Sequence, residues 1–71
     1  MKPEFLPKTP EGRRWRLAEE CGEVVRALSK IGRFGAIGIG YDGHENNTEA
    51  LKAELADLRH AIEAVEHDLS S

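Results

Sequence analysis

The sequence predicts an all-α protein, an antiparallel helical hairpin that assembles into a four-helix bundle by homo-oligomerisation. Two segments of the 71-residue chain carry apolar residues at the three-and-four spacing of an amphipathic helix. A glycine-rich segment separates them and allows the chain to turn back. A chain this short rarely forms a stable core alone, and the single cysteine, Cys21, excludes an intrachain disulfide. A partner chain is therefore the expected source of stability.

The first helix is predicted from about Pro10 to Ile31. Thr9 is a good N-cap residue, and Pro10 suits the first helical turn, where its missing N–H would have no partner. The apolar residues that follow at helical spacing are Leu17, Cys21, Val24, Leu28 and Ile31. We expect this stripe to face the second helix.

Residues 32–47, GRFGAIGIGYDGHENN, are predicted to form a loop because five glycines interrupt any helical periodicity. The loop contains a literal G-x-G-x-x-G at Gly38, Gly40 and Gly43. In a dinucleotide-binding fold this motif follows a β-strand and opens a helix. No segment before the motif has the pattern of such a strand, and the chain is too short for a βαβ sheet. We interpret the motif as a flexible connector.

The second helix is predicted over about 48–69, with Asn47 or Thr48 as its cap. Its apolar residues repeat the spacing of the first helix and are Leu51, Leu55, Leu58, Ile62, Val65 and Leu69. Residues 1–71 are thus interpreted as one small helical domain.

The composition excludes several classes of function. The formal net charge of −3 argues against general nucleic-acid binding. No stretch approaches the length and hydropathy of a membrane span, and the N-terminus lacks the apolar run of a signal peptide. We therefore expect a cytoplasmic protein without a membrane or nucleic-acid partner.

The same acidic pattern occurs twice, in LAEECGEVV (17–25) and LKAELADLR (51–59). When the two leucines are aligned, Glu20 corresponds to Glu54 and Glu23 to Asp57. At about 100° of rotation per residue, both acidic pairs flank the apolar stripe on the same border. In an antiparallel hairpin with facing stripes, the four carboxylates are expected to converge along one edge of the helix pair.

Four carboxylates at one edge repel one another unless a cation neutralises them. An all-oxygen cluster without histidine or cysteine suits Mg²⁺, or Mn²⁺ in its place, better than zinc. Protein-bound Mg²⁺ is commonly completed by substrate phosphates, so the pattern predicts a phosphate-bearing substrate. The same acidic spacings are also common on solvated helix faces, which leaves a purely surface role for these residues open.

The combined pattern resembles the MazG-like all-α nucleoside triphosphate pyrophosphohydrolases. EECGE, followed after a loop by ELAD, resembles the E-E-x-x-E and E-x-x-D signature of that family. The similarity extends over LAEECGEVVRALSKIGRFG and NNTEALKAELADL and covers about residues 17–62. It implies a helical fold, dependence on a divalent metal, and hydrolysis of a nucleoside or deoxynucleoside triphosphate to the monophosphate and pyrophosphate.

Carried over by position, the resemblance implies four metal ligands that form the catalytic site: Glu20, Glu23, Glu54 and Asp57. Glu19, the remaining acid of the signature, falls on the opposite face of the predicted helix and is not expected to be a ligand. Lys30 and Arg33 are candidates for contacts with the triphosphate, and Asn47 resembles the asparagine that precedes the second acidic helix. Complementing or capping the helix ends is an alternative role for these three residues.

Other functions remain compatible with the sequence. One is a non-catalytic helical module that dimerises and regulates a partner, and another is a related pyrophosphohydrolase that acts on a phosphoribosyl-nucleotide. A dimer and a tetramer both fit the apolar stripes. Trp15, opposite the stripe, is a candidate for base stacking or for packing on another subunit.

Overall fold

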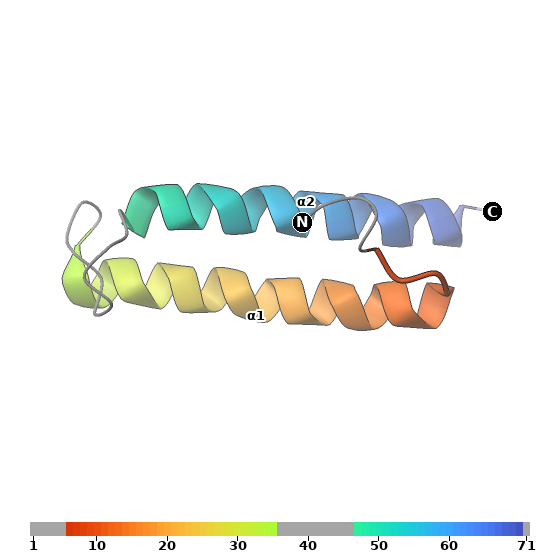
Figure 1. Cartoon of the computed structure of the whole chain (residues 1–71), viewed down its shortest axis with the longest axis horizontal. Coiled ribbons are helices and arrows are strands. Elements are labelled where there is room, and N and C mark those ends of the chain that lie inside the picture. Colours follow the sequence, from red (N-terminus) through yellow and green to blue (C-terminus); the bar gives the residue numbers. More distant parts are fainter. Residues whose placement is uncertain (1–5, 36–46, 71) are drawn as a thin grey trace.

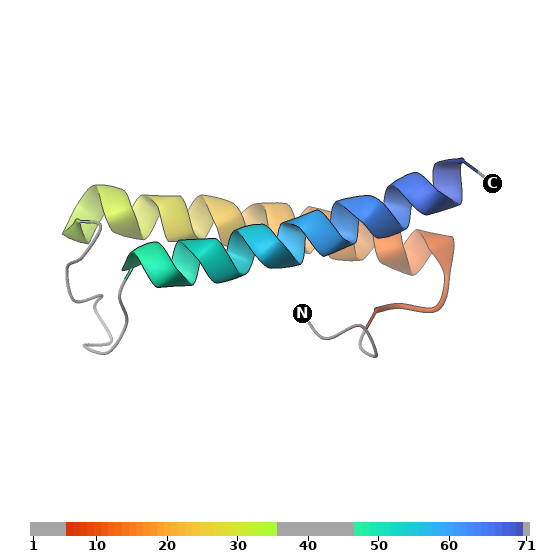
Figure 2. The same ribbon diagram turned by 90° about the horizontal axis from the view of Figure 1, so that it is seen from above.

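The computed structural model describes residues 6–35 and 47–70, which form two long helices and no strand (Figure 1). Helix α1 spans Pro10–Phe34 and helix α2 spans Asn47–Leu69. The two helices lie side by side and run antiparallel, crossing at a shallow angle (Figure 2). The prediction of an all-α hairpin is confirmed. Gly38, Gly40 and Gly43 lie outside the described residues.

The N-terminus of α1 has the predicted cap. The Thr9 hydroxyl accepts a hydrogen bond from the Gly12 N–H at 3.0 Å, and Pro10 occupies the first helical turn. The helix continues to Phe34, three residues beyond the predicted end at Ile31. It ends at Gly35, whose φ of +88° lies in the region that favours glycine. Gly35, rather than Gly32, therefore terminates α1.

Asn47 joins the two helices at the loop end of the hairpin. Its Nδ2 donates to the Gly35 carbonyl at 2.9 Å, and the residue is 1% exposed. Its Oδ1 is buried without a hydrogen-bond partner, so Asn47, one of the two predicted caps, does not cap α2 with its side chain. The carboxamide instead links the end of α1 to the start of α2.

Arg13 joins the helices at the open end of the hairpin. Its Nε and Nη2 donate to the two carboxylate oxygens of Asp68 at 2.7 and 2.8 Å. Its Nη1 donates to the Pro7 carbonyl at 3.0 Å. One guanidinium thus connects α2, α1 and the segment that leads into α1.

The core between the helices is small. Among the described residues, Ala27, Ala61 and Val65 are the buried apolar side chains, and Glu20 and Asn47 are the buried polar ones. The buried residues of α1 are seven positions apart, and those of α2 follow one another at intervals of fourteen and four, which fits the heptad pattern of two helices packed along a narrow seam. No helix in the described part of the chain is long and apolar enough to span a bilayer.

The predicted apolar stripes are only partly buried. Leu28 is 52% exposed, Cys21 is exposed, and Leu69 is 75% exposed, contrary to the expectation that the stripes face each other throughout. The stripes are too wide for one partner helix to cover. The uncovered residues form what we call the apolar side of the hairpin: Cys21, Val25, Leu28, Leu55, Ile62 and Leu69.

Candidate metal centre

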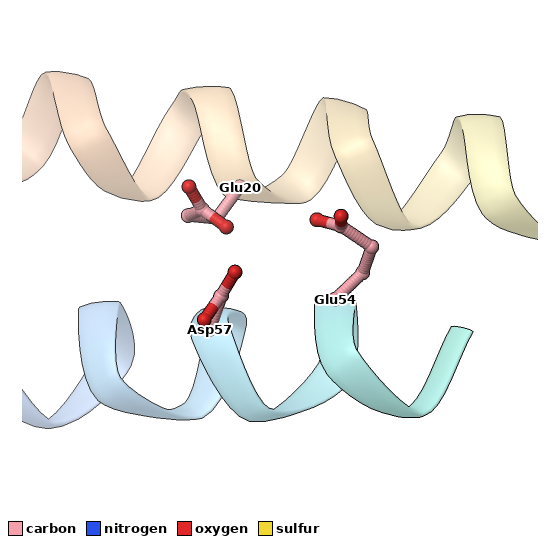
Figure 3. Close-up of side chains that lie close together, drawn as sticks. All are labelled: Glu20, Glu54 and Asp57. Atoms are coloured by element: carbon pink, nitrogen blue, oxygen red, sulfur yellow. The ribbon is translucent and has the colours of Figure 1, made fainter. Parts of the chain in front are cut away.

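Three of the predicted carboxylates meet between the helices. Glu20 projects from α1, and Glu54 and Asp57 project from α2 toward it (Figure 3). One carboxylate oxygen from each residue lies within 4.8 Å of the other two. Glu54 and Asp57 share a face of α2 because they are three residues apart. We call these three residues the carboxylate trio.

Glu20 is the most buried member of the trio, at 3% exposure, and Glu54 and Asp57 are partly buried. Glu20 Oε1 pairs with Arg16 Nη2 at 3.1 Å. Glu20 Oε2 is buried and has no hydrogen-bond partner. A carboxylate oxygen removed from water without a donor is energetically costly, and two further carboxylates nearby add repulsion.

A divalent cation would relieve both costs. Three carboxylate oxygens at this separation form a hard, all-oxygen donor set, which suits Mg²⁺ or Mn²⁺. The partial exposure of Glu54 and Asp57 leaves a solvent-facing side on which water or phosphate oxygens can complete the coordination. The residues of the trio therefore fit a divalent ion.

A cavity of about 230 Å³ adjoins the trio through Glu54. Its lining combines small apolar residues with both signs of charge: Glu23, Arg26, Ala27, Lys30, Asn47, Ala50, Ala53 and Glu54. The two cationic side chains come from α1, and the alanines leave open space beside them. This combination can hold an anionic group next to an ion bound by the trio.

The other predicted residues are divided between this cavity and the surface. Glu23 lines the cavity together with Glu54 but is not part of the trio. Lys30 and Asn47 also line the cavity. Arg33 is exposed and does not belong to the lining, and the Glu19 side chain is 67% exposed.

Two basic residues at the site were missed in the sequence. Arg16 pairs with Glu20, and Arg26 lines the cavity. Their spacing in the sequence indicates contact with the acidic residues, since Arg16 precedes Glu20 by four residues and Arg26 follows Glu23 by three.

Comparison with known proteins gives one family. The family described as MazG nucleotide pyrophosphohydrolase domain matches residues 8–66, which include all of the trio and the residues that line the cavity. No curated protein and no solved structure matches the chain.

Proposed function

The chain belongs to the MazG nucleotide pyrophosphohydrolase family, and we propose that it hydrolyses nucleoside or deoxynucleoside triphosphates to the monophosphate and pyrophosphate, with Mg²⁺ as cofactor. The observation that carries this proposal is the carboxylate trio, in which Oε2 of Glu20 is buried and unpartnered. Water screens an acidic cluster at the protein surface, whereas a cation bound to this one would offset the cost of its buried carboxylate oxygen.

Glu20, Glu54 and Asp57 are the proposed ligands of the ion. Glu23 is the proposed fourth ligand, because it lies one turn after Glu20 on α1 and shares the cavity with Glu54. A divalent ion bound there supplies neutralisation of the phosphate charge and a lowered pKa for an attacking water. The carboxylates would hold the ion from both helices.

The cavity is the proposed site for the phosphates of the substrate. Lys30 and Arg26 would donate to phosphate oxygens and offset negative charge as the bond between the α- and β-phosphates breaks. Asn47 lines the same cavity, and Arg33 follows Lys30 by one turn on the exposed surface of α1. These four residues are thus proposed to orient the triphosphate relative to the trio.

We further propose that the active form is a homo-oligomer in which the apolar sides of two hairpins pack together as a four-helix bundle. Within the described residues only three apolar residues are buried in the hairpin, which is a small core for an independent domain. Val25 at 63% and Leu28 at 52% exposure would be covered in such a pair. A dimer is the smallest assembly that does this.

The test is identification of the products formed from a panel of ribo- and deoxynucleoside triphosphates with Mg²⁺ or Mn²⁺. The expected products are the monophosphate and pyrophosphate, and none should form with excess EDTA. Release of inorganic phosphate and a nucleoside diphosphate would contradict the proposed bond cleavage. Absence of any product from folded, oligomeric, metal-supplied protein would favour a non-catalytic helical module.

A further inference from the structure

Arg16 lies beside the carboxylate trio, next to the buried carboxylate of Glu20. Its Nη2 lies 3.1 Å from Oε1 of Glu20, and its Nη1 lies 3.8 Å from Oε2 of Glu19. Its Nε is buried without a hydrogen-bond partner. The guanidinium therefore lies along the buried carboxylate and uses only part of its hydrogen-bonding capacity.

This pair differs from an ordinary helix-surface ion pair in the same molecule. Lys52 and Glu49 also lie one helical turn apart, but their side chains are 68% and 67% exposed. Those of Arg16 and Glu20 are 31% and 4% exposed. Because water screens the first pair and is largely excluded from Glu20, the charge of Arg16 matters far more to Glu20 than that of Lys52 does to Glu49.

The two oxygens of Glu20 have different surroundings. Oε1 is bound to Arg16, whereas Oε2 has no partner. Glu54 and Asp57 each contribute an oxygen to the same cluster. A guanidinium on one oxygen holds the carboxylate in place while leaving the other oxygen for a cation.

We propose that Arg16 is a positioning residue and a built-in counter-ion for the trio: it holds Glu20 by one oxygen and offsets the cluster's negative charge when no metal is bound. This inference rests on the proposed metal site. Arg16 stabilises the ion-free fold and, being a nearby positive charge, weakens binding of the divalent ion. The fold is thereby kept stable without metal, and the ion binds reversibly.

The test compares thermal unfolding of the wild type and Arg16→Gln, first with EDTA and then over a series of Mg²⁺ concentrations. Arg16→Gln should lower the Tm of the ion-free protein and should show a larger Mg²⁺-induced rise in Tm than the wild type. Calorimetric titration should give an Mg²⁺ affinity about tenfold higher, the order expected when one unit charge is removed a few ångströms from a divalent ion.

Two further variants serve as controls. Arg16→Lys keeps the positive charge, so its Mg²⁺-induced rise in Tm should stay close to that of the wild type. Arg14→Gln makes the same change of net charge two residues away, at an exposed position outside the trio and the cavity, and should leave the Mg²⁺ affinity unchanged.

A purely structural role predicts a different result. The inference is overturned if the substitution lowers Tm by the same amount with and without Mg²⁺, or if Arg16→Gln binds Mg²⁺ no more tightly than the wild type. Neither result would contradict the metal site itself. If the wild type shows no response to Mg²⁺ or Mn²⁺, the proposed function fails and the inference fails with it.

A measurement on the wild type can still overturn the inference if Arg16→Gln does not fold. The NMR signal of the Arg16 side-chain Nε–H, identified by its absence from the Arg16→Lys spectrum, should shift as Mg²⁺ is added. A signal that stays unchanged at saturating Mg²⁺ would overturn the inference.

Discussion

Glu20 is a charged residue with only 3% of its surface exposed, and the hairpin places it opposite Glu54 and Asp57. A helical wheel centred on the leucines puts Glu20 at the border of the apolar stripe, whereas the structure puts it inside the seam. The difference arises because the two helices pack along a narrow seam with heptad spacing, and this seam does not follow the centre of the wider apolar stripe. Sequence pattern thus identified the residue but underestimated its burial.

The three members of the trio and Glu23 should not be equivalent. We predict that Asp57→Asn abolishes the Mg²⁺-induced rise in Tm and lowers kcat by about a hundredfold or more, because it removes a negative charge and one of the two carboxylate oxygens of this residue from the trio. Glu23→Gln should retain part of the Mg²⁺-induced rise, because the proposed fourth ligand lies outside the trio and the trio itself stays intact. Differential scanning fluorimetry with increasing Mg²⁺ measures both.

Glu66→Gln, an exposed change on α2 outside the trio and the cavity, is the control for these two variants. An equal loss of the Mg²⁺ response in Asp57→Asn and Glu23→Gln would show that the four acids act as one set. That result would contradict the distinction drawn from the structure.

At the scale of the elements, the end of α1 is set by backbone conformation. Gly35 has a φ of +88°, whereas Gly32 is helical, and an added Cβ would meet no heavy atom within 4 Å at either position. We predict that Gly35→Ala lowers the free energy of unfolding by about 1–3 kcal/mol through backbone strain. Gly32→Ala should raise it by about 0.5–1 kcal/mol, since alanine favours the helix.

Urea unfolding of the two glycine variants provides this comparison. They make the same chemical change three residues apart, so each is the control for the other. Equal effects of the two substitutions would contradict the assignment of Gly35 as the terminating residue.

At the open end of the hairpin, the hydrogen bonds from Arg13 hold the pKa of the Asp68 carboxyl below its ordinary value. A carboxyl group with a lowered folded-state pKa contributes stability above its unfolded-state value of about 4, and this stability is lost as the pH falls toward the folded-state value. We predict that Tm falls as the pH drops below about 4, and that Asp68→Asn has a lower Tm at neutral pH and a smaller fall over this acid range.

Thermal unfolding between neutral and strongly acidic pH tests the role of this pair. Glu63→Gln, an exposed change on the same helix, should leave the acid dependence of the wild type intact. A variant Asp68→Asn with the full acid dependence of the wild type would contradict a stabilising role for Arg13 and Asp68.

The two helices and the Thr9 cap could be read from the sequence because each depends on local spacing and on residue types with strong preferences. The pair of Arg13 and Asp68 could not, because 55 positions separate the residues and only the register of the hairpin brings them together. The convergence of Glu20 with Glu54 and Asp57 lies between these cases. It could be predicted from the repeated acidic pattern, but only together with the expected antiparallel arrangement of the helices.

At the scale of the whole molecule, the hairpin has two unlike sides. The cavity with Glu23, Arg26 and Lys30 lies on one side of the seam, and Cys21, Val25 and Leu28 lie on the other side of the same helix. A second hairpin can therefore cover the apolar side without blocking the cavity. This separation is compatible with a site that remains open in the assembly.

The proposed assembly predicts that Leu28→Glu weakens self-association by about a hundredfold or more, because it places an unpaired charge in an apolar contact. Leu28 is 52% exposed in the hairpin, so the change is tolerated by a single chain. Sedimentation velocity should show a dimer or larger species for the wild type and a monomer for Leu28→Glu. His60→Glu, at an exposed position away from the apolar side, should keep the mass of the wild type, and an unchanged mass for Leu28→Glu would refute this interface.

The most direct measurement is Mg²⁺-dependent pyrophosphate release by the wild type, Glu54→Gln and Glu66→Gln, with the best substrate of the triphosphate panel. Glu54 belongs to both the trio and the cavity, so its loss should reduce pyrophosphate release by about a hundredfold or more, while Glu66→Gln stays at the wild-type rate. If folded Glu54→Gln releases pyrophosphate as fast as the wild type, the carboxylate trio is not the catalytic metal site.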